Sequence, residues 1–207
     1  MEYTNPEVPE GINTSNDNPL KEFAYLTIGV LSLTLFLIVS ISIFAEKLAP
    51  YIPFDAEVKL TQSLVDSAQS HPQQSRYLQA LADQLSQAMD LPAEMTLTVH
   101  YNDSDVVNAY ATLGGHIVIY RGLIEKMSSE NALAMVVAHE IAHIKHRDPI
   151  VSLGRSAMAT LALSAITGNS GADVLGSAGL YTLLKFNRDM ESVADVEALN
   201  ALQNHYG

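Results

Sequence analysis

The chain has 207 residues, a formal net charge of -12 and no cysteine. The absence of cysteine excludes disulfides, thiolate metal sites and a cysteine nucleophile, so any metal site must use His, Asp or Glu. Nucleic-acid-binding proteins carry a basic surface patch, whereas this chain is acidic, so no nucleic-acid partner is expected. The length leaves about one domain beside an N-terminal apolar segment.

The N-terminal part divides into a tail and an apolar run. Residues 1–22 are polar and rich in proline, which predicts a disordered tail. Phe23 to Ala45 carries no charge, and a helix of that length would extend roughly 34 Å, enough to cross a hydrocarbon core of ~30 Å. We therefore expect a single-pass transmembrane anchor, in a bacterial inner membrane. Lysines on both sides leave the orientation undecided. Of the two orientations, we favour slightly the one with a periplasmic catalytic domain.

A linker over residues 46–56, containing Pro50 and Pro53, is expected to precede a domain over residues 57–207. Helices are predicted over Val58–Ser70, Gln74–Met89, Asn131–His146 and 150–167, and from about Val174 after a break at Gly168–Gly171. The helix over Asn131–His146 is expected to end at Asp148-Pro149. Strands are predicted over Met95–His100, Val106–Thr112 and His116–Tyr120, the last two forming a hairpin around Leu113-Gly114-Gly115. The pattern indicates a mainly α fold with a small antiparallel sheet (α+β). A second uncharged stretch, Ser156 to Ala172, is expected to pack inside the domain.

The predicted helix over Asn131–His146 contains His139-Glu140-Ile141-Ala142-His143. Residues at i and i+4 share a helix face, so both imidazoles can meet one ion. Glu140 lies about 100° round the helix from His139, within reach of a water on the metal, where it can act as general base. Zinc is the metal that this spacing favours, at one ion per chain.

A catalytic zinc takes a third protein ligand, for which the sequence offers two candidates. His146 lies one turn beyond His143 near the helix end, where an ion held by the first two histidines is hard to reach. Glu191 is the better candidate, because Glu191 and Asp195 share a face of a later helix. Asp195 can then accept a hydrogen bond from the free N–H of a ligand histidine and fix its ring.

These motifs, together with Asn108-Ala109-Tyr110-Ala111 before Gly114-Gly115 and Tyr120-Arg121-Gly122-Leu123-Ile124, resemble the HtpX-like metalloproteases and their CAAX prenyl endopeptidase relatives over roughly residues 75–200. The resemblance implies a zincin-like, membrane-associated zinc endopeptidase with two His and one Glu as ligands and Glu140 as base. It also implies that an edge strand binds substrate, and the matching residues are Asn108, Ala109, Tyr110 and Ala111. A later His-Pro…Arg segment of that family is not found before Gly207. That departure leaves open a longer protein and leaves any transition-state donor unassigned.

The expected function is therefore hydrolysis of peptide bonds in protein or peptide substrates, in membrane or envelope protein quality control. The alternative is a zinc-binding chaperone or assembly factor with lost or minor protease activity. Glu140 argues against that alternative, because a site that only binds zinc needs no base. The physiological substrate and the oligomeric state are not encoded in these patterns.

Overall fold

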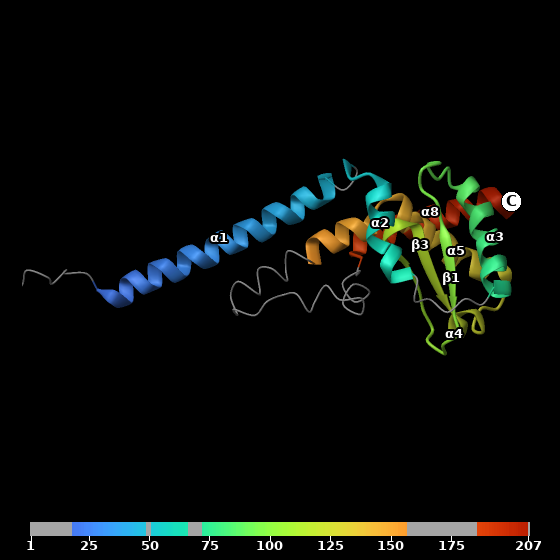
Figure 1. Cartoon of the computed structure of the whole chain (residues 1–207), viewed down its shortest axis with the longest axis horizontal. Helices are drawn as coiled ribbons and strands as arrows, with labels where there is room; N and C mark the ends of the chain where they lie inside the picture. Colours follow the sequence, from blue (N-terminus) through green and yellow to red (C-terminus); the bar gives the residue numbers. More distant parts are fainter. Residues whose placement is uncertain (1–17, 49–50, 66–71, 157–185, 207) are drawn as a thin grey trace, which may run out of the picture.

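The computed structural model describes residues 18–48, 51–65, 72–156 and 186–206. Its described part is mostly helical with one three-stranded sheet (Figure 1). The helices are α1 (Pro19–Leu48), α2 (Phe54–Val65), α3 (Pro72–Ala88), α4 (Arg121–Ile124), α5 (Glu130–Lys145) and α8 (Arg188–Tyr206). The strands are β1 (Thr98–Asn102), β2 (Ala109–Thr112) and β3 (His116–Tyr120), with a 3-10 turn, η2 (Leu113–Gly115), between the last two. A further helix covers 148–156.

Helix α1 extends away from the rest of the described chain (Figure 1). Its segment Pro19–Ile41 has a mean hydropathy of 2.3 and none of it is buried by the protein. Among the described residues it is the one helix long and apolar enough to cross a membrane. It includes most of the predicted apolar run. Of the tail predicted over residues 1–22, residues 1–17 lie outside the described residues, whereas residues 19–22 form the first turn of α1. The stretch over residues 157–172 also lies outside the described residues.

The sheet has the strand order β1-β3-β2, with the hairpin partner β3 in the centre. Strands β2 and β3 are antiparallel, which confirms the predicted hairpin. Strands β1 and β3 are parallel, so the sheet is mixed and not purely antiparallel as predicted. Strand β3 lies between β1 and β2, and these two outer strands run in opposite directions, so β3 is antiparallel to β2 and parallel to β1. The tight turn of the hairpin sets only the relative direction of β2 and β3.

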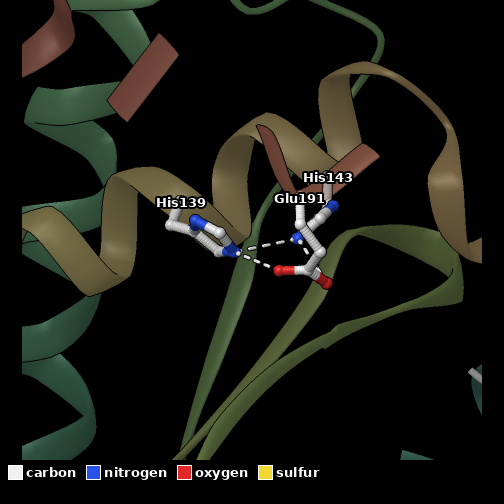
Figure 2. Close-up of side chains that lie close together, drawn as sticks. All are labelled: His139, His143 and Glu191. Carbon is white, nitrogen blue, oxygen red and sulfur yellow. Dashed lines mark hydrogen bonds and ion pairs between the residues drawn. The ribbon is translucent and has the colours of Figure 1, made fainter. Parts of the chain in front are cut away.

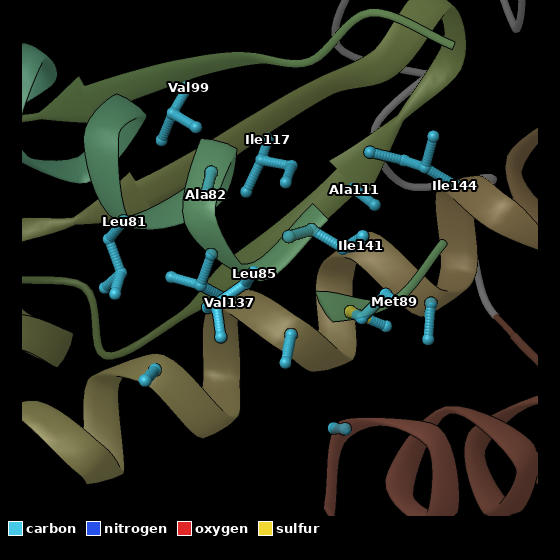
Figure 3. Close-up of a cluster of buried hydrophobic side chains, with 14 of the residues drawn as sticks. Leu81, Ala82, Leu85, Met89, Val99, Ala111, Ile117, Val137, Ile141 and Ile144 are labelled. Atoms are coloured by element: carbon cyan, nitrogen blue, oxygen red, sulfur yellow. The ribbon is translucent and has the colours of Figure 1, made fainter. Parts of the chain in front are cut away.

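One sheet face carries the core of the domain (Figure 3). Strand residues Val99, Ala111, Ile117 and Ile119 are buried there against helices α3 and α5. The stripe predicted on the α3 segment is buried in full, through Leu78, Leu81, Leu85 and Met89. Helix α5 contributes Leu133, Ala134, Val137, Ala138 and Ile141, all at most 4% exposed. Burial on this scale fixes α5, and so fixes the motif that α5 carries.

Polar groups account for three differences from the predicted boundaries. Residues 95–97 are not strand, because the Met95 N–H turns back to Pro92 O at 2.8 Å. Residues 106–108 are loop rather than strand. The last helix begins at Arg188, since the Asn187 side chain accepts the Met190 N–H at 2.9 Å as an N-cap. The expected start near Val174 and the break at Gly168–Gly171 lie outside the described residues.

The outer edge of β1 is bridged by a side chain. The Gln79 amide accepts the Val99 N–H at 2.8 Å and donates to Leu97 O at 3.2 Å, as a neighbouring strand would. The other edge of the sheet is β2, which lies beside α5. Of the sheet's two edges, β2 is therefore the one that can accept an added strand close to the two histidines of α5.

Candidate metal centre

Helix α5 holds the two histidines of the motif in a fixed register. Ser129 caps its N-terminus by accepting the Ala132 N–H at 3.2 Å, and the apolar face of the helix is buried. His139 and His143 then lie one turn apart, and their Nε2 atoms are 3.0 Å from each other. His143 is 1% exposed and its ring stacks on Phe186, with ring centroids 4.0 Å apart. One histidine is thus deeply buried, while the other lies at the rim.

Helix α8 brings a carboxylate to the same point. Glu191 Oε2 lies 3.4 Å from His139 Nε2, and Glu191 Oε1 lies 3.9 Å from His143 Nε2. Figure 2 shows the three side chains pointing toward one another from α5 and α8. The three predicted ligand residues therefore converge, although Glu191 is 48 positions after His143 in the chain. One ligand atom from each of the three residues lies within 4.8 Å of the others.

The donor set fits a zinc ion. Two imidazole nitrogens and one carboxylate are the ligand types that catalytic zinc takes when it keeps a fourth position open. Tetrahedral bonds of about 2.0–2.1 Å place neighbouring ligand atoms about 3.3 Å apart. The separations of 3.0 Å and 3.4 Å about His139 Nε2 are close to that value. Without a cation, two Nε2 atoms and a carboxylate would face one another in a cluster of which only His143 is fully buried, and a cation stabilises such a set of acceptors.

Each histidine has a carboxylate behind it. Asp195 Oδ1 lies 3.0 Å from His139 Nδ1, which is the contact predicted for Asp195. Asp148 Oδ2 lies 2.8 Å from His143 Nδ1, and Asp148 is only 5% exposed. Sequence reasoning missed Asp148, because Asp148-Pro149 was interpreted only as a helix end. Such carboxylate–histidine pairs leave each Nε2 free for a metal and fix the ring orientation.

Glu140 lies beside this cluster without joining it. Its side chain is 7% exposed and accepts a hydrogen bond from the backbone N–H of Ala111 in β2. Burial raises the pKa of Glu140, and nearby Glu191 adds to the rise, whereas His143, His139 and the Ala111 N–H oppose it. A buried carboxylate with a raised pKa is better matched to taking up and releasing a proton near neutral pH than an exposed one.

His146, the alternative third ligand, lies elsewhere. Its Nε2 is 3.2 Å from Glu197 Oε1, a carboxylate that also pairs with Lys145 Nζ at 3.4 Å. His146 is not in the group of side chains that could hold a metal. The geometry therefore favours Glu191 over His146.

The strand residues expected to bind substrate are partly in β2. Asn108 precedes the strand, and its carbonyl accepts the Tyr120 N–H at 3.2 Å. In an antiparallel pair, the residues whose main-chain N–H and C=O groups point at the partner strand alternate along the chain. The main-chain groups of Tyr110 therefore point at β3, as the Asn108 carbonyl does, whereas those of Ala109 and Ala111 point outward. The outward N–H of Ala111 is the one bound by Glu140. Ala109 and the Ala111 carbonyl thus lie on the side where a further strand would pair.

The loop before β2 is held by a cation and a glycine. Arg121 pairs with Asp103 at 2.7 Å, Asp105 at 2.5 Å and Glu125 at 2.9 Å, and these contacts raise its pKa. Gly122 approaches the loop so closely that a Cβ there would lie 2.2 Å from Asp105 O. These contacts keep residues 106–108 out of the strand.

Residues 72–207 match the sequence profile of peptidase family M48. The chain belongs to peptidase family M48. The resemblance stated above is thereby confirmed at the level of this family of metallopeptidases. Shorter matches reach the beta-barrel assembly-enhancing proteases of Yersinia pestis and Escherichia coli. Each is 40% identical over 45 residues, which is 22% of this chain and 9% of the relative. A relative from Vibrio cholerae is 46% identical over 41 residues, 20% of this chain and 8% of that protein. The matched segment is thus about a tenth of each relative's length.

Proposed function

We propose that this M48 family member is a membrane-anchored, zinc-dependent endopeptidase. The observation that supports it best is the convergence of His139, His143 and Glu191 beside the buried Glu140. Under this proposal the first three residues hold one zinc ion, and Asp195 and Asp148 orient the two histidines through Nδ1. The chemistry of the donor set, rather than the fold alone, supports zinc.

The chain's own proton chemistry is assigned to Glu140. When bound, zinc supplies Lewis acidity, which polarises a scissile carbonyl and makes water more acidic. Glu140 takes a proton from the attacking water, whose oxygen forms the new bond to the carbonyl carbon. The same carboxyl gives that proton to the leaving amine as the C–N bond breaks. Because Glu140 is buried, bulk water does not compete with it for the proton.

Substrate alignment is assigned to the outer edge of β2. An extended peptide can pair with the outward main-chain groups of Ala109 and the Ala111 carbonyl. Because Ala111 also donates its N–H to Glu140, a peptide paired there lies next to the proton carrier. Main-chain pairing is blind to most side chains, which fits an enzyme acting on protein substrates in general.

The cellular setting is proposed from α1 and from the relatives. Helix α1 serves as a single-pass anchor, since its apolar length suits a bilayer. The relatives from Yersinia pestis and Escherichia coli carry the name of beta-barrel assembly-enhancing proteases. Their names support the proposed role in envelope protein quality control, and we place the domain on the periplasmic side of the inner membrane as a further part of the proposal. Carbonate extraction tests the anchor, and a C-terminal reporter fusion tests the side; release into the supernatant would refute anchoring.

The deciding experiment compares the full chain with Glu140→Gln at matched zinc content. Gln keeps the size and polarity of Glu but cannot accept the proton, so fold and zinc should survive. Turnover of an unfolded model protein such as casein should fall by roughly 10²–10⁴-fold or more. A wild-type chain that binds zinc and yet shows the same turnover as the variant would favour the chaperone or assembly-factor alternative. Absence of zinc binding in the wild-type chain would contradict both.

A further inference from the structure

A buried carboxylate outside the family-matched region contacts two sides of the site. Glu57 lies on α2, before residue 72 where the family match begins, and is 4% exposed. Its Oε1 accepts from Arg147 Nε at 2.8 Å, and its Oε2 accepts from the Gly114 N–H at 3.1 Å. Arg147 is itself only 8% exposed. Both oxygens of a fully buried carboxylate are therefore committed to groups from distant parts of the chain.

The first contact controls the turn after α5. Arg147 has φ 62, a left-handed conformation that a side chain makes unfavourable and that glycine usually supplies after a helix. Its guanidinium is held by Glu57 and by Ile52 O, at 2.9 Å from Nη2, and lies over the Phe54 ring. The next residue is Asp148, which contacts His143 Nδ1. The pairing with Glu57 thus keeps a strained residue in the conformation that aims Asp148 at the histidine.

The second contact controls the end of β2. Gly114 is the second residue after β2 and also has a positive φ, 70. It sits so close to α2 that a Cβ would lie 2.6 Å from Thr61 Oγ1 and 3.0 Å from Val58 Cα. The hydrogen bond to Glu57 fixes this turn against α2. Ala111, three residues earlier, is the donor to Glu140.

We propose that Glu57 is a positioning residue for the metallopeptidase site. It sets Asp148, and through it His143, by holding Arg147, and it sets the Ala111 end of β2 by holding Gly114. The part of this inference that concerns Asp148 and His143 rests on the proposed zinc site, whereas the part that concerns β2 does not. A buried ion pair gives little net stability over apolar residues of the same volume, so stabilisation alone is a weak reason for its presence here. Helix α2, which follows the anchor helix in the chain, is thereby part of the catalytic architecture.

The test measures zinc affinity, without any assay of hydrolysis. Full-length chain in detergent is titrated with zinc against a chromophoric chelator, as wild type, Glu57→Gln, Arg147→Gln and the double variant. Loss of a group that orients a ligand typically weakens metal binding 10–100-fold, and we expect at least tenfold for each variant. Because the two residues act as one unit, the double variant should be no weaker than the worse single variant.

Two variants control for loss of stability. Thr61→Val removes a buried hydroxyl from the same helix, where it bonds to carbonyls of α2 itself, and Leu78→Ala opens a core cavity on α3. Both should bind zinc within twofold of wild type at a temperature where all variants are folded by circular dichroism. Wild-type affinity in folded Glu57→Gln, or an equal loss in Leu78→Ala, would overturn the positioning role.

Amide hydrogen exchange of the metal-free protein tests whether the contact between Glu57 and Gly114 holds the end of β2. Glu57→Gln should speed exchange at Ala111 to Gly115 by tenfold or more relative to α3, whereas Leu78→Ala should speed α3 instead. Uniform acceleration over both segments would mean that Glu57 is only structural. If the wild-type chain binds no zinc, the proposed function fails, and this exchange measurement still decides whether Glu57 holds β2.

Discussion

Replacing Asp148 by Asn separates the role of the carboxylate behind His143 from its shape. Asn fills the same volume and its carbonyl oxygen can still accept from Nδ1, so the change removes the negative charge and little else. The contact is 2.8 Å long, and both residues are nearly inaccessible, at 1% for the His143 side chain and 8% for that of Asp148. The matched variant is Asp195→Asn behind His139, where the carboxylate is 67% exposed.

The burial of the two pairs sets the expected magnitudes. A charge-assisted hydrogen bond is roughly twice as strong as a neutral one, and loss of a buried carboxylate behind a ligand histidine typically weakens metal binding 10–100-fold. That range corresponds to about 1.4–2.8 kcal/mol for Asp148→Asn. The exposed pair at Asp195 is screened by solvent and is worth about 1 kcal/mol or less, a factor of up to about five in zinc affinity.

The assay is chelator competition for zinc at fixed pH and ionic strength, with folding of each variant checked by circular dichroism. Asp148→Asn should lose at least several times more affinity than Asp195→Asn. Equal losses, or a larger loss at Asp195, would refute the argument that burial makes the Asp148 contact the stronger one. Zinc binding unchanged in both variants would remove the orienting role from each carboxylate.

Three further outcomes follow from the geometry. Glu191→Ala should lose zinc in metal analysis while His146→Ala keeps it; the opposite result would transfer the third-ligand role to His146. His116 has its pKa lowered to about 4, chiefly by burial and then by His100, so the folded protein binds fewer protons there than the unfolded chain, whose histidine titrates near 6.5. Its contribution to stability is therefore complete above about pH 6.5 and is lost as the pH falls toward 4. His116→Gln should flatten denaturant-measured stability over that interval, by no more than about 2 kcal/mol because the ring is partly exposed, and an unchanged slope would contradict this. Gly122→Ala should lower the free energy of unfolding by about 1–3 kcal/mol, since the new Cβ meets Asp105 O at 2.2 Å; urea midpoints equal to wild type would show that the loop yields freely.

The sequence was sufficient for the parts of the site that follow helical periodicity. His139 and His143 meet because they are one turn apart, and Glu191 and Asp195 share a face for the same reason. Asp148 was missed because its position depends on the left-handed backbone at Arg147, and a non-glycine residue gives no signal of that conformation. Asp148-Pro149 indicates a helix end, without indicating where the chain turns next.

Long-range pairing was the other limit. The hairpin was predictable from its glycines, yet the place of β1 beside β3 depends on contacts that no local pattern encodes. Glu57 and Arg147 are 90 residues apart, and each alone resembles an ordinary charged surface residue. The boundary at Arg188 follows from a single capping side chain, Asn187, within a segment whose composition suits a longer helix.

The Gln79 bridge on β1 has a consequence for how this protein behaves at high concentration. When both edge strands of a small sheet are unpaired, other copies of the protein can pair with either edge and form aggregates. With Gln79 bonded to the Val99 N–H and the Leu97 carbonyl, a strand added on that side cannot pair with those two groups. The remaining edge of the sheet is β2. Under the proposed function, a bound substrate chain covers that edge and keeps other copies of the protein from pairing with it.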